Sequence, residues 1–213
     1  MRITKFGHAC VRIEYDEQVL VIDPGSWSER EALDGATAVL VTHEHPDHLD
    51  LDNLRATEAP VFTIQAVVEQ MAQAPEVRER VTVVGPDEEF DAGLPVQTVG
   101  EWHAVIHPEL PRFHNCGYVV SVGESRIYHP GDALTTPAQQ VDLLLLPAHA
   151  PWSKTSEVVD FARAVRAPRS VAIHDGLLND RGLELVGRLV SGGLEQHDQT
   201  YQRVAPGNEI SLG

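Results

Sequence analysis

A stretch of nine residues, 42–50, constrains this chain more than any other part of it. Its sequence, T-H-E-H-P-D-H-L-D, holds three histidines and three carboxylates, and it follows the apolar run T-A-V-L-V at residues 37–41. The apolar run is typical of a buried strand, and the end of a strand gives the next side chains a rigid base. Imidazoles and carboxylates bind metal ions when they converge to about 2.0–2.2 Å. The pattern therefore predicts a metal-binding turn between a strand and a helix that opens near residues 49–54.

Three later residues occupy positions that would complete such a site. His103 follows a predicted strand at residues 94–100, Asp132 lies in a G-D turn, and His174 follows a predicted strand at residues 169–173. Together with the turn at 42–50, these motifs resemble the metallo-β-lactamase fold superfamily, in which they occur in the same order. The resemblance runs from residue 3 to near residue 212, and the length suits one domain over residues 1–213. It implies an α/β fold, a four-layer αββα sandwich of two mixed β-sheets with outer helices.

The resemblance also implies two divalent metal ions that share one carboxylate ligand. The ligand types suit several ions, so Zn²⁺ is favoured while Mn²⁺, Ni²⁺ and Fe²⁺ remain alternatives. Carried over position by position, the ligands are His43, His45 and His103 at the first site, Asp47, His48 and His174 at the second, and Asp132 between the two.

Such a centre predicts hydrolysis of an ester, a lactone or a phosphoester. Two metal ions can share a hydroxide, because metal binding lowers the pKa of water from 15.7 to ≈ 7. One ion also polarises the substrate oxygen and stabilises the developing negative charge. Asp47 is the expected catalytic residue, which orients the hydroxide and accepts its proton. No serine nucleophile is needed, and the chain contains no G-x-S-x-G motif.

Other functions of the same fold stay open at this point. A mononuclear iron-dependent dioxygenase would use similar residues with one ion, and a phosphodiesterase or nuclease would use the same two sites. The net charge of −16, with 16 basic and 32 acidic residues, counts against a nucleic-acid partner. A small-molecule substrate is therefore expected.

The third ligand of the first site has an alternative. Residues 101–116 contain His103, His107 and His114, and only the first of these directly follows a strand. His107 lies in a proline-flanked loop of the kind that covers a site, so it is the second choice. His107, His114 and Asn115 are also candidates for substrate contact.

Further residues are expected around the metal ions. The G-H-A sequence at residues 7–9, followed by a strand and D-P-G at 23–25, is similar to the branch that includes ascorbate-6-phosphate lactonases. It places His8 at the rim of the site. The remaining candidates are Asp50 and Asp175, expected to accept imidazole N–H groups, and His149, Trp152 and Lys154, which follow a predicted strand and are expected to shape the pocket.

The sequence predicts a cytoplasmic protein that does not enter membranes. It contains no run of 18 apolar residues, and its N-terminus lacks the apolar segment of a signal peptide. The two cysteines, Cys10 and Cys116, suit a reducing compartment and are expected to be small core residues. Whether the protein forms a homo-oligomer is left open.

Several further elements are predicted from hydrophobic patterns and turn residues. A hairpin is expected across residues 118–128 and a central buried strand at 142–146. Helices are expected at 63–71, at 76–80, at 158–165 with Ser153 or Thr155 as its cap, and at 183–190, ended by Gly192 and Gly193. Residues 85–91 are expected to form an acidic turn, and 201–204 and 209–212 to be strands.

Overall fold

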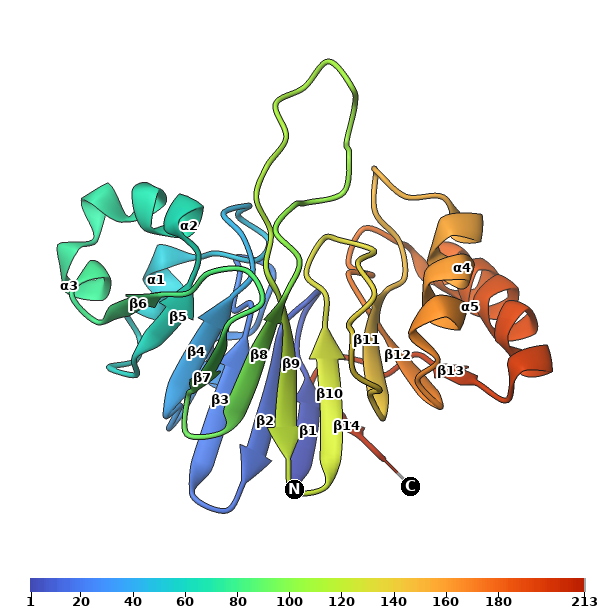
Figure 1. Ribbon diagram of the computed structural model, residues 1–213, viewed down its shortest axis with the longest axis horizontal. Coiled ribbons are helices and arrows are strands. Elements are labelled where there is room, and N and C mark those ends of the chain that lie inside the picture. Colours follow the sequence, from blue (N-terminus) through green and yellow to red (C-terminus); the bar gives the residue numbers. More distant parts are fainter. Residues whose placement is uncertain (213) are drawn as a thin grey trace.

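Two seven-stranded sheets face each other, with helices on both outer sides (Figure 1). The computed structural model describes residues 1–212. Each sheet contains both parallel and antiparallel strand pairs. The predicted four-layer αββα sandwich of two mixed sheets is therefore confirmed. Within residues 1–212, no helix has the length and apolar character needed to cross a bilayer.

The first sheet contains the N-terminal strands together with the last strand of the chain. Its strands are β1 Arg2–Lys5, β2 Val11–Tyr15, β3 Gln18–Ile22, β4 Ala38–Val41, β5 Val61–Thr63, β6 Val81–Val83 and β14 Glu209–Ile210. They lie in the order β14-β1-β2-β3-β4-β5-β6. The strands from β3 to β6 are parallel, so their carboxyl ends lie at the same edge.

The second sheet has a similar arrangement. Its strands are β7 Glu89–Asp91, β8 Pro95–Val99, β9 Gly117–Val122, β10 Ser125–His129, β11 Leu143–Pro147, β12 Arg169–Ile173 and β13 Thr200–Gln202. They lie in the order β13-β12-β11-β10-β9-β8-β7. The strands from β10 to β13 are parallel, and the β9–β10 hairpin has the predicted turn, with Ser125 opposite Val122.

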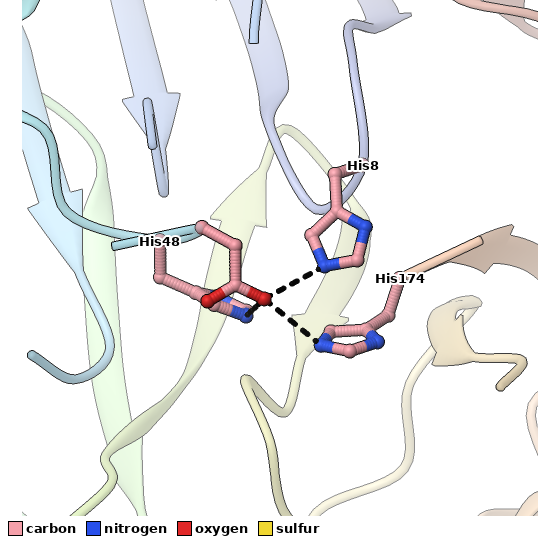
Figure 2. Close-up of side chains that lie close together, drawn as sticks. His8, His48 and His174 are labelled. Carbon is pink, nitrogen blue, oxygen red and sulfur yellow. Dashed lines mark hydrogen bonds and ion pairs between the residues drawn. The ribbon is translucent and has the colours of Figure 1, made fainter. Parts of the chain in front are cut away.

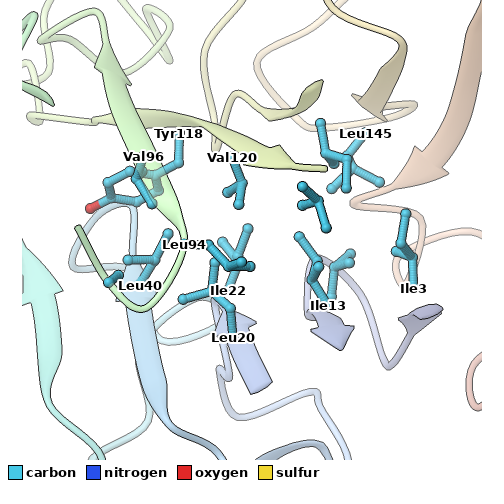
Figure 3. Packing of buried hydrophobic residues seen from close by; sticks show 14 of the residues in the cluster. Ile3, Ile13, Leu20, Ile22, Leu40, Leu94, Val96, Tyr118, Val120 and Leu145 are labelled. Carbon is cyan, nitrogen blue, oxygen red and sulfur yellow. The ribbon is translucent and has the colours of Figure 1, made fainter. Parts of the chain in front are cut away.

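The main core lies between the two sheets. Ile13, Leu20 and Ile22 of the first sheet pack against Tyr118 and Leu145 of the second, as Figure 3 shows. All five side chains are fully buried. Removal of this apolar surface from water, worth about 25 cal/mol per Å², holds the two sheets together.

Helices cover the outer face of each sheet. On the first sheet, residues of the short helices such as Leu54 and Met71 pack against Val39. On the second sheet, Phe161 packs in one cluster with Leu144. The helices are η1 Arg30–Leu33, α1 Leu51–Leu54, α2 Gln65–Glu69, η2 Gln70–Gln73 and α3 Pro75–Arg78 on the first side, and α4 Thr155–Val165, α5 Asp180–Leu194 and η3 Glu195–His197 on the second.

The carboxyl ends of strands from both sheets meet at one edge of the sandwich. The Cys116 N–H donates to the Thr42 carbonyl (3.0 Å), and the Tyr118 hydroxyl donates to the Val41 carbonyl (2.9 Å). These bonds join the end of β4 to the start of β9. The loop between β8 and β9 stands out from this edge at the top of Figure 1. Such an edge is where α/β proteins commonly bind ligands.

Two short strands were not predicted from the sequence. β5 ends at Thr63, where a helix was expected to begin, and α2 begins only at Gln65. β7 lies inside the predicted acidic turn region and pairs with β8 at the sheet edge. Each of these strands has three residues, too few to show an alternating pattern, and only pairing with a neighbour forms them.

Other predictions about element ends were wrong as well. The N-cap of α4 is Lys154, whereas the Ser153 hydroxyl bonds to the backbone of Ala150. Both strands predicted near the end of the chain do form, and they belong to different sheets, because β13 pairs with β12 and β14 pairs with β1.

The prediction that α5 ends at its two glycines was also wrong. The helix continues through Gly192 and Gly193 to the buried Leu194. A Cβ atom at Gly193 would lie 2.6 Å from Cγ1 of Val159 on α4, whereas one at Gly192 would meet nothing within 4 Å. Gly193 therefore permits the close approach of the two helices, and burial of the last turn outweighs the low helix propensity of glycine.

This contact predicts opposite effects for two neighbouring substitutions. Gly192→Ala should raise the free energy of unfolding by about 0.4–1 kcal/mol, because alanine restricts the unfolded chain at a site with free space. Gly193→Ala should lower it by about 1 kcal/mol, because overpacking costs more than the gain in helix propensity. Urea denaturation of both variants checks the pair. Equal stabilisation by both would show that α4 and α5 are not in close contact at Gly193.

Candidate metal centre

Two groups of metal-ligand side chains lie side by side at this edge of the sandwich. Within each group, one ligand atom from every member lies within 4.8 Å of the others. The first group comes from the turn after β4, the β8–β9 loop and the turn after β10, and the second adds residues that follow β1 and β12. The groups are His43, His45, His103 and Asp132, and His8, Asp47, His48 and His174.

All seven ligands inferred from the sequence are thus brought together, and His8 joins them. His103 is fully buried in the first group, whereas His107 is exposed and lies outside both groups. Among the described residues, the geometry favours His103 over His107 as the third histidine.

Hydrogen bonds through Nδ1 fix three of the imidazole rings. His103 Nδ1 donates to the Ala104 carbonyl (2.6 Å) and His174 Nδ1 donates to the His149 carbonyl (2.7 Å). His48 Nδ1 donates to Oδ2 of Asp23 (2.7 Å). Carbonyl and carboxylate oxygens only accept, so each Nδ1 carries a proton, and each Nε2 presents a lone pair when its ring is neutral. This is the tautomer that a metal-binding histidine requires.

The hydrogen-bond pattern of the remaining atoms fits metal ions. Nε2 of His48, His103 and His174 and Oδ1 of Asp132 are buried and have no hydrogen-bond partner. Buried polar atoms without a partner are costly and uncommon in folded proteins. Cations bound by the two groups would satisfy all four atoms.

Asp132 lies in contact with both groups. Its Oδ2 is 3.4 Å from Nε2 of His103 and 3.1 Å from Nε2 of His174, and its Oδ1 is 3.1 Å from Nε2 of His48. Oδ2 thus faces a histidine of each group, while Oδ1 faces only the second group, so this carboxylate lies between the two. The Trp152 indole N–H donates to Oδ2 of Asp132 (3.0 Å) and holds it in this orientation.

The turn that carries Asp132 is fixed by Asn115. The side chain of Asn115 accepts from the Asp132 N–H (2.9 Å) and donates to the Pro130 carbonyl (2.9 Å). Gly131 has φ +61°, and a Cβ atom there would lie 2.3 Å from Oδ1 of Asn115. Only glycine fits between the two. Asn115 is fully buried, so its predicted role in substrate contact was wrong.

Asp23 is the main residue that sequence reasoning missed. Its fully buried carboxylate accepts from the Thr42 N–H (2.8 Å), the Thr42 hydroxyl (2.7 Å) and Nδ1 of His48. Because the Thr42 hydroxyl donates to Asp23, its oxygen accepts from Nδ1 of His43 (2.9 Å). The D-P-G sequence had been interpreted only as the end of a strand and part of a resemblance. Its aspartate in fact orients two imidazoles.

His8 lies in the second group, but its hydrogen bonds give it a different role. Figure 2 shows the rings of His8, His48 and His174 facing the same space. Nδ1 of His8 accepts from the Gly176 N–H (3.2 Å), so Nε2 carries the proton and donates to Oδ2 of Asp47 (3.0 Å). A nitrogen that carries a proton has no lone pair for a metal ion. His8 therefore holds Asp47 in position.

Burial and neighbouring charges set the protonation of the site. Burial lowers the pKa of His43 well below its usual value and also lowers that of His45, so both rings are neutral. Burial alone would raise the pKa of Asp132, yet His48 and His174 hold it well below its usual range. Burial opposes the charged form of His174, but Asp132 raises its pKa to about 9. The buried carboxylate thus attracts positive charge to the point where the two groups meet.

Several predicted accessory residues have other partners. Asp50 accepts from the Asn53 N–H (2.9 Å) and caps α1, and Asp175 accepts from Lys5 and Arg203. The prediction that these two carboxylates accept imidazole N–H groups was therefore wrong. The imidazole N–H groups donate instead to Asp23, Thr42 and two backbone carbonyls.

The remaining candidates lie at varying distances from the centre. His149 supports His174 through its carbonyl, and Lys154 is exposed and pairs with Glu157 (3.0 Å). His114 stacks on Trp102 with ring centroids 4.3 Å apart. Among the predicted pocket residues, Trp152 lines a cavity together with the candidate ligands.

The choice between His103 and His107 is open to a direct test. His103→Ala should lose most of the metal of the first group, because it removes a buried lone pair that faces Asp132. His107→Ala should retain the metal, because its side chain is exposed in the loop. Elemental analysis after dialysis against metal-free buffer measures both. Loss of metal from His107→Ala alone would reverse the assignment.

Comparison with known proteins agrees with this fold. A family model described as Beta-lactamase superfamily domain matches residues 2–174. Protein Rv0786c of Mycobacterium tuberculosis is 43% identical over 183 residues, which cover 84% of this chain and 85% of the relative. A UPF0173 metal-dependent hydrolase of Aeropyrum pernix is 27% identical over 203 residues, 82% of each chain. Igni18, a solved metallo hydrolase structure from Ignicoccus hospitalis, superposes with a TM-score of 0.72 at 18% identity and covers 98% of this chain and 97% of its own. The family model spans most of the chain, and the chain therefore belongs to the beta-lactamase superfamily.

Proposed function

We propose that this protein is a metal-dependent hydrolase with a two-metal centre that cleaves ester, lactone or phosphoester bonds. The observation that carries the proposal is the set of three buried, unpartnered imidazole nitrogens around Asp132, together with its own unpartnered Oδ1. His43, His45 and His103 would hold one ion, Asp47, His48 and His174 the other, and Asp132 would contact both. The names of the relatives, which include metal-dependent hydrolase, support the same class of reaction.

The number of ligands supports two ions, and their chemistry favours Zn²⁺. The first group provides three imidazole nitrogens and the second, leaving out His8, provides two, and such sites suit Zn²⁺ better than Mg²⁺ or Ca²⁺. Mn²⁺, Ni²⁺ and Fe²⁺ are the alternatives to be compared with it. When bound, the ions would supply Lewis-acid activation of water and of the substrate oxygen.

The position of Asp47 suits a carboxylate that accepts a proton from the attacking water. Its side chain is 19% exposed and lines the cavity, while the other candidate carboxylate, Asp132, is almost fully buried. Burial would raise the pKa of Asp47, but the neighbouring rings of His174 and His8 lower it far below its usual range. The carboxylate is therefore ionised at neutral pH and can accept a hydrogen bond from water in the cavity.

In the proposed reaction, water adds across the bond that is cleaved. For an ester or lactone, the oxygen of water bonds to the carbonyl carbon and the bond from that carbon to the leaving oxygen breaks. One proton of the water passes through Asp47 toward the leaving oxygen, so the products are an acid and an alcohol. His8 keeps Oδ2 of Asp47 in place during this transfer through its 3.0 Å hydrogen bond.

The number of metal ions bound per chain is the first test of the proposal. Protein loaded with Zn²⁺ and then dialysed should contain close to two ions per chain, because the two groups together provide three histidines on one side and two histidines and Asp47 on the other. A constant value of one ion, unchanged by adding metal, would instead indicate a mononuclear centre such as that of an iron-dependent dioxygenase.

A conservative substitution separates proton transfer from metal binding. Asp47→Asn keeps the shape of the side chain but removes the proton acceptor, so turnover should fall by about 10²–10⁴-fold. Metal of the first group should remain bound. Kinetics on an ester or lactone, with metal content measured in parallel, provide the test.

The matched control for this substitution is His197→Ala. His197 is exposed in η3, far in sequence from every ligand motif, and its removal should leave turnover unchanged. Turnover of Asp47→Asn close to that of the unaltered protein, at full metal content, would show that Asp47 is not the proton acceptor.

A further inference from the structure

The cavity above the candidate metal centre is lined by two kinds of side chain, candidate metal ligands and apolar residues. Its volume is about 410 Å³, and five of its lining residues are candidate metal ligands. Every other lining residue has an apolar or aromatic side chain. These six residues are Trp27, Pro46, Ile106, Pro151, Trp152 and Leu177. The indole N–H of Trp152 is already bonded to Asp132, so it is not free to bind a ligand.

Three of these side chains converge from separate loops and stay accessible to solvent. Trp27 follows β3, Ile106 lies in the β8–β9 loop, and Leu177 lies between β12 and α5. Their exposed fractions are 47%, 38% and 47%. Exposed apolar side chains that gather at a cavity mark a ligand-binding surface, because a bound apolar group removes them from water.

The nearby cationic side chains serve other purposes. Arg112 lies 5.2 Å from the centre of the Trp102 ring and donates to the His103 carbonyl (3.4 Å), and Lys154 pairs with Glu157. Both cations line the neighbouring cavity. Among the described residues, the walls of the cavity above the metal centre contain neither lysine nor arginine.

These observations decide between the substrate types of the proposed reaction. A phosphate or carboxylate group outside the reacting bond would need an arginine or lysine partner in the cavity. The net charge of −16 also repels anionic substrates from the molecule. An alkyl or aryl group, in contrast, would gain by covering Trp27, Ile106 and Leu177.

We infer that the substrate is an uncharged ester or lactone with an alkyl or aryl group next to the bond that is cleaved, rather than a compound with a phosphate or carboxylate group outside that bond, such as a phosphorylated sugar. This inference rests on the proposed function, because it assigns the substrate of the same centre. The metal ligands hold the reacting group, and the apolar walls bind the chain attached to it.

Alkyl hydroxamates of increasing length test the inference without relying on turnover. The hydroxamate group binds divalent ions through two oxygens, so the alkyl chain extends into the cavity. Calorimetric titration of the Zn²⁺-loaded protein should give tighter binding along the series from acetohydroxamate to octanohydroxamate, by up to about fourfold for each methylene. Octanohydroxamate with a terminal carboxylate should bind more weakly than the plain compound.

Substitutions in the cavity wall test which side chains bind the alkyl group. Ile106→Ala and Leu177→Ala should each lower the binding ratio of octanohydroxamate to acetohydroxamate by about threefold or more, because they remove apolar surface from the wall. Leu185→Ala is the matched control. Leu185 lies on α5 and is 49% exposed outside the cavity, so the ratio should not change.

The outcomes separate this inference from the proposed function. A ratio that does not depend on chain length, in protein that holds its metal, would overturn the substrate inference alone. Tighter binding of the carboxylate-tipped compound, lost in Arg112→Ala, would overturn it in favour of an anionic substrate that reaches the neighbouring cavity. A protein that binds neither Zn²⁺ nor any hydroxamate would contradict both the inference and the proposed function.

Discussion

The buried carboxylate of Asp23 is the interaction on which the candidate metal centre depends. It accepts hydrogen bonds from the backbone and hydroxyl of Thr42 and from His48, so it joins the end of β3 to the turn after β4. An unpartnered carboxylate at this depth would be costly, and three donors offset that cost. Through Thr42 the same carboxylate also fixes His43. One aspartate thereby sets the orientation of an imidazole in each of the two ligand groups.

The backbone around the centre is held in unfavourable conformations. His8, Asp23 and His174 all have positive φ angles, between 50° and 56°. Each such residue costs of order 1–3 kcal/mol, and the surrounding contacts must supply that energy. At Gly25 a Cβ atom would lie 2.0 Å from the Asp47 carbonyl, so the D-P-G turn can approach the metal turn only with glycine there.

A buried ion pair holds the other side of the centre. Lys5 on β1 is fully buried, and its Nζ lies 2.6 Å from Oδ1 of Asp175, next to His174. Arg203 donates to the second oxygen of the same carboxylate (3.2 Å). Burial lowers the pKa of Lys5, and Asp175 opposes this effect. The pair connects the first sheet to the loop that carries His174, which explains why an aspartate follows this histidine although it touches no imidazole.

Polar and apolar surfaces are therefore sharply separated at the site. Ligand atoms, their hydrogen-bond partners and the ion pair lie deep at the sheet ends, whereas Trp27, Ile106 and Leu177 lie in the loops above them. Rigid strands suit the ligands, because their geometry must be fixed. Loops suit the substrate walls, because they can vary without disturbing the strands.

The sequence by itself determined the class of fold and the identity of the residues that gather at the centre. The alternation of apolar strands and ligand-rich turns is a local property, and the order of the motifs matches a known arrangement. The long strands β9 to β12 and the turn at residues 42–50 could be predicted for this reason. Strands of three residues, such as β5 and β7, could not, because pairing with neighbours alone forms them.

Only the tertiary structure decided what each side chain does. Whether His8 binds a metal ion or holds Asp47 depends on which ring nitrogen carries the proton, and the Gly176 N–H, 168 positions away in sequence, settles this. Asp50 and Asp175, and not Asp23, were predicted from the sequence to accept imidazole N–H groups, yet their partners are a helix end and an ion pair. Hydrogen bonds and packing form between residues that are distant along the chain, so no local pattern contains them.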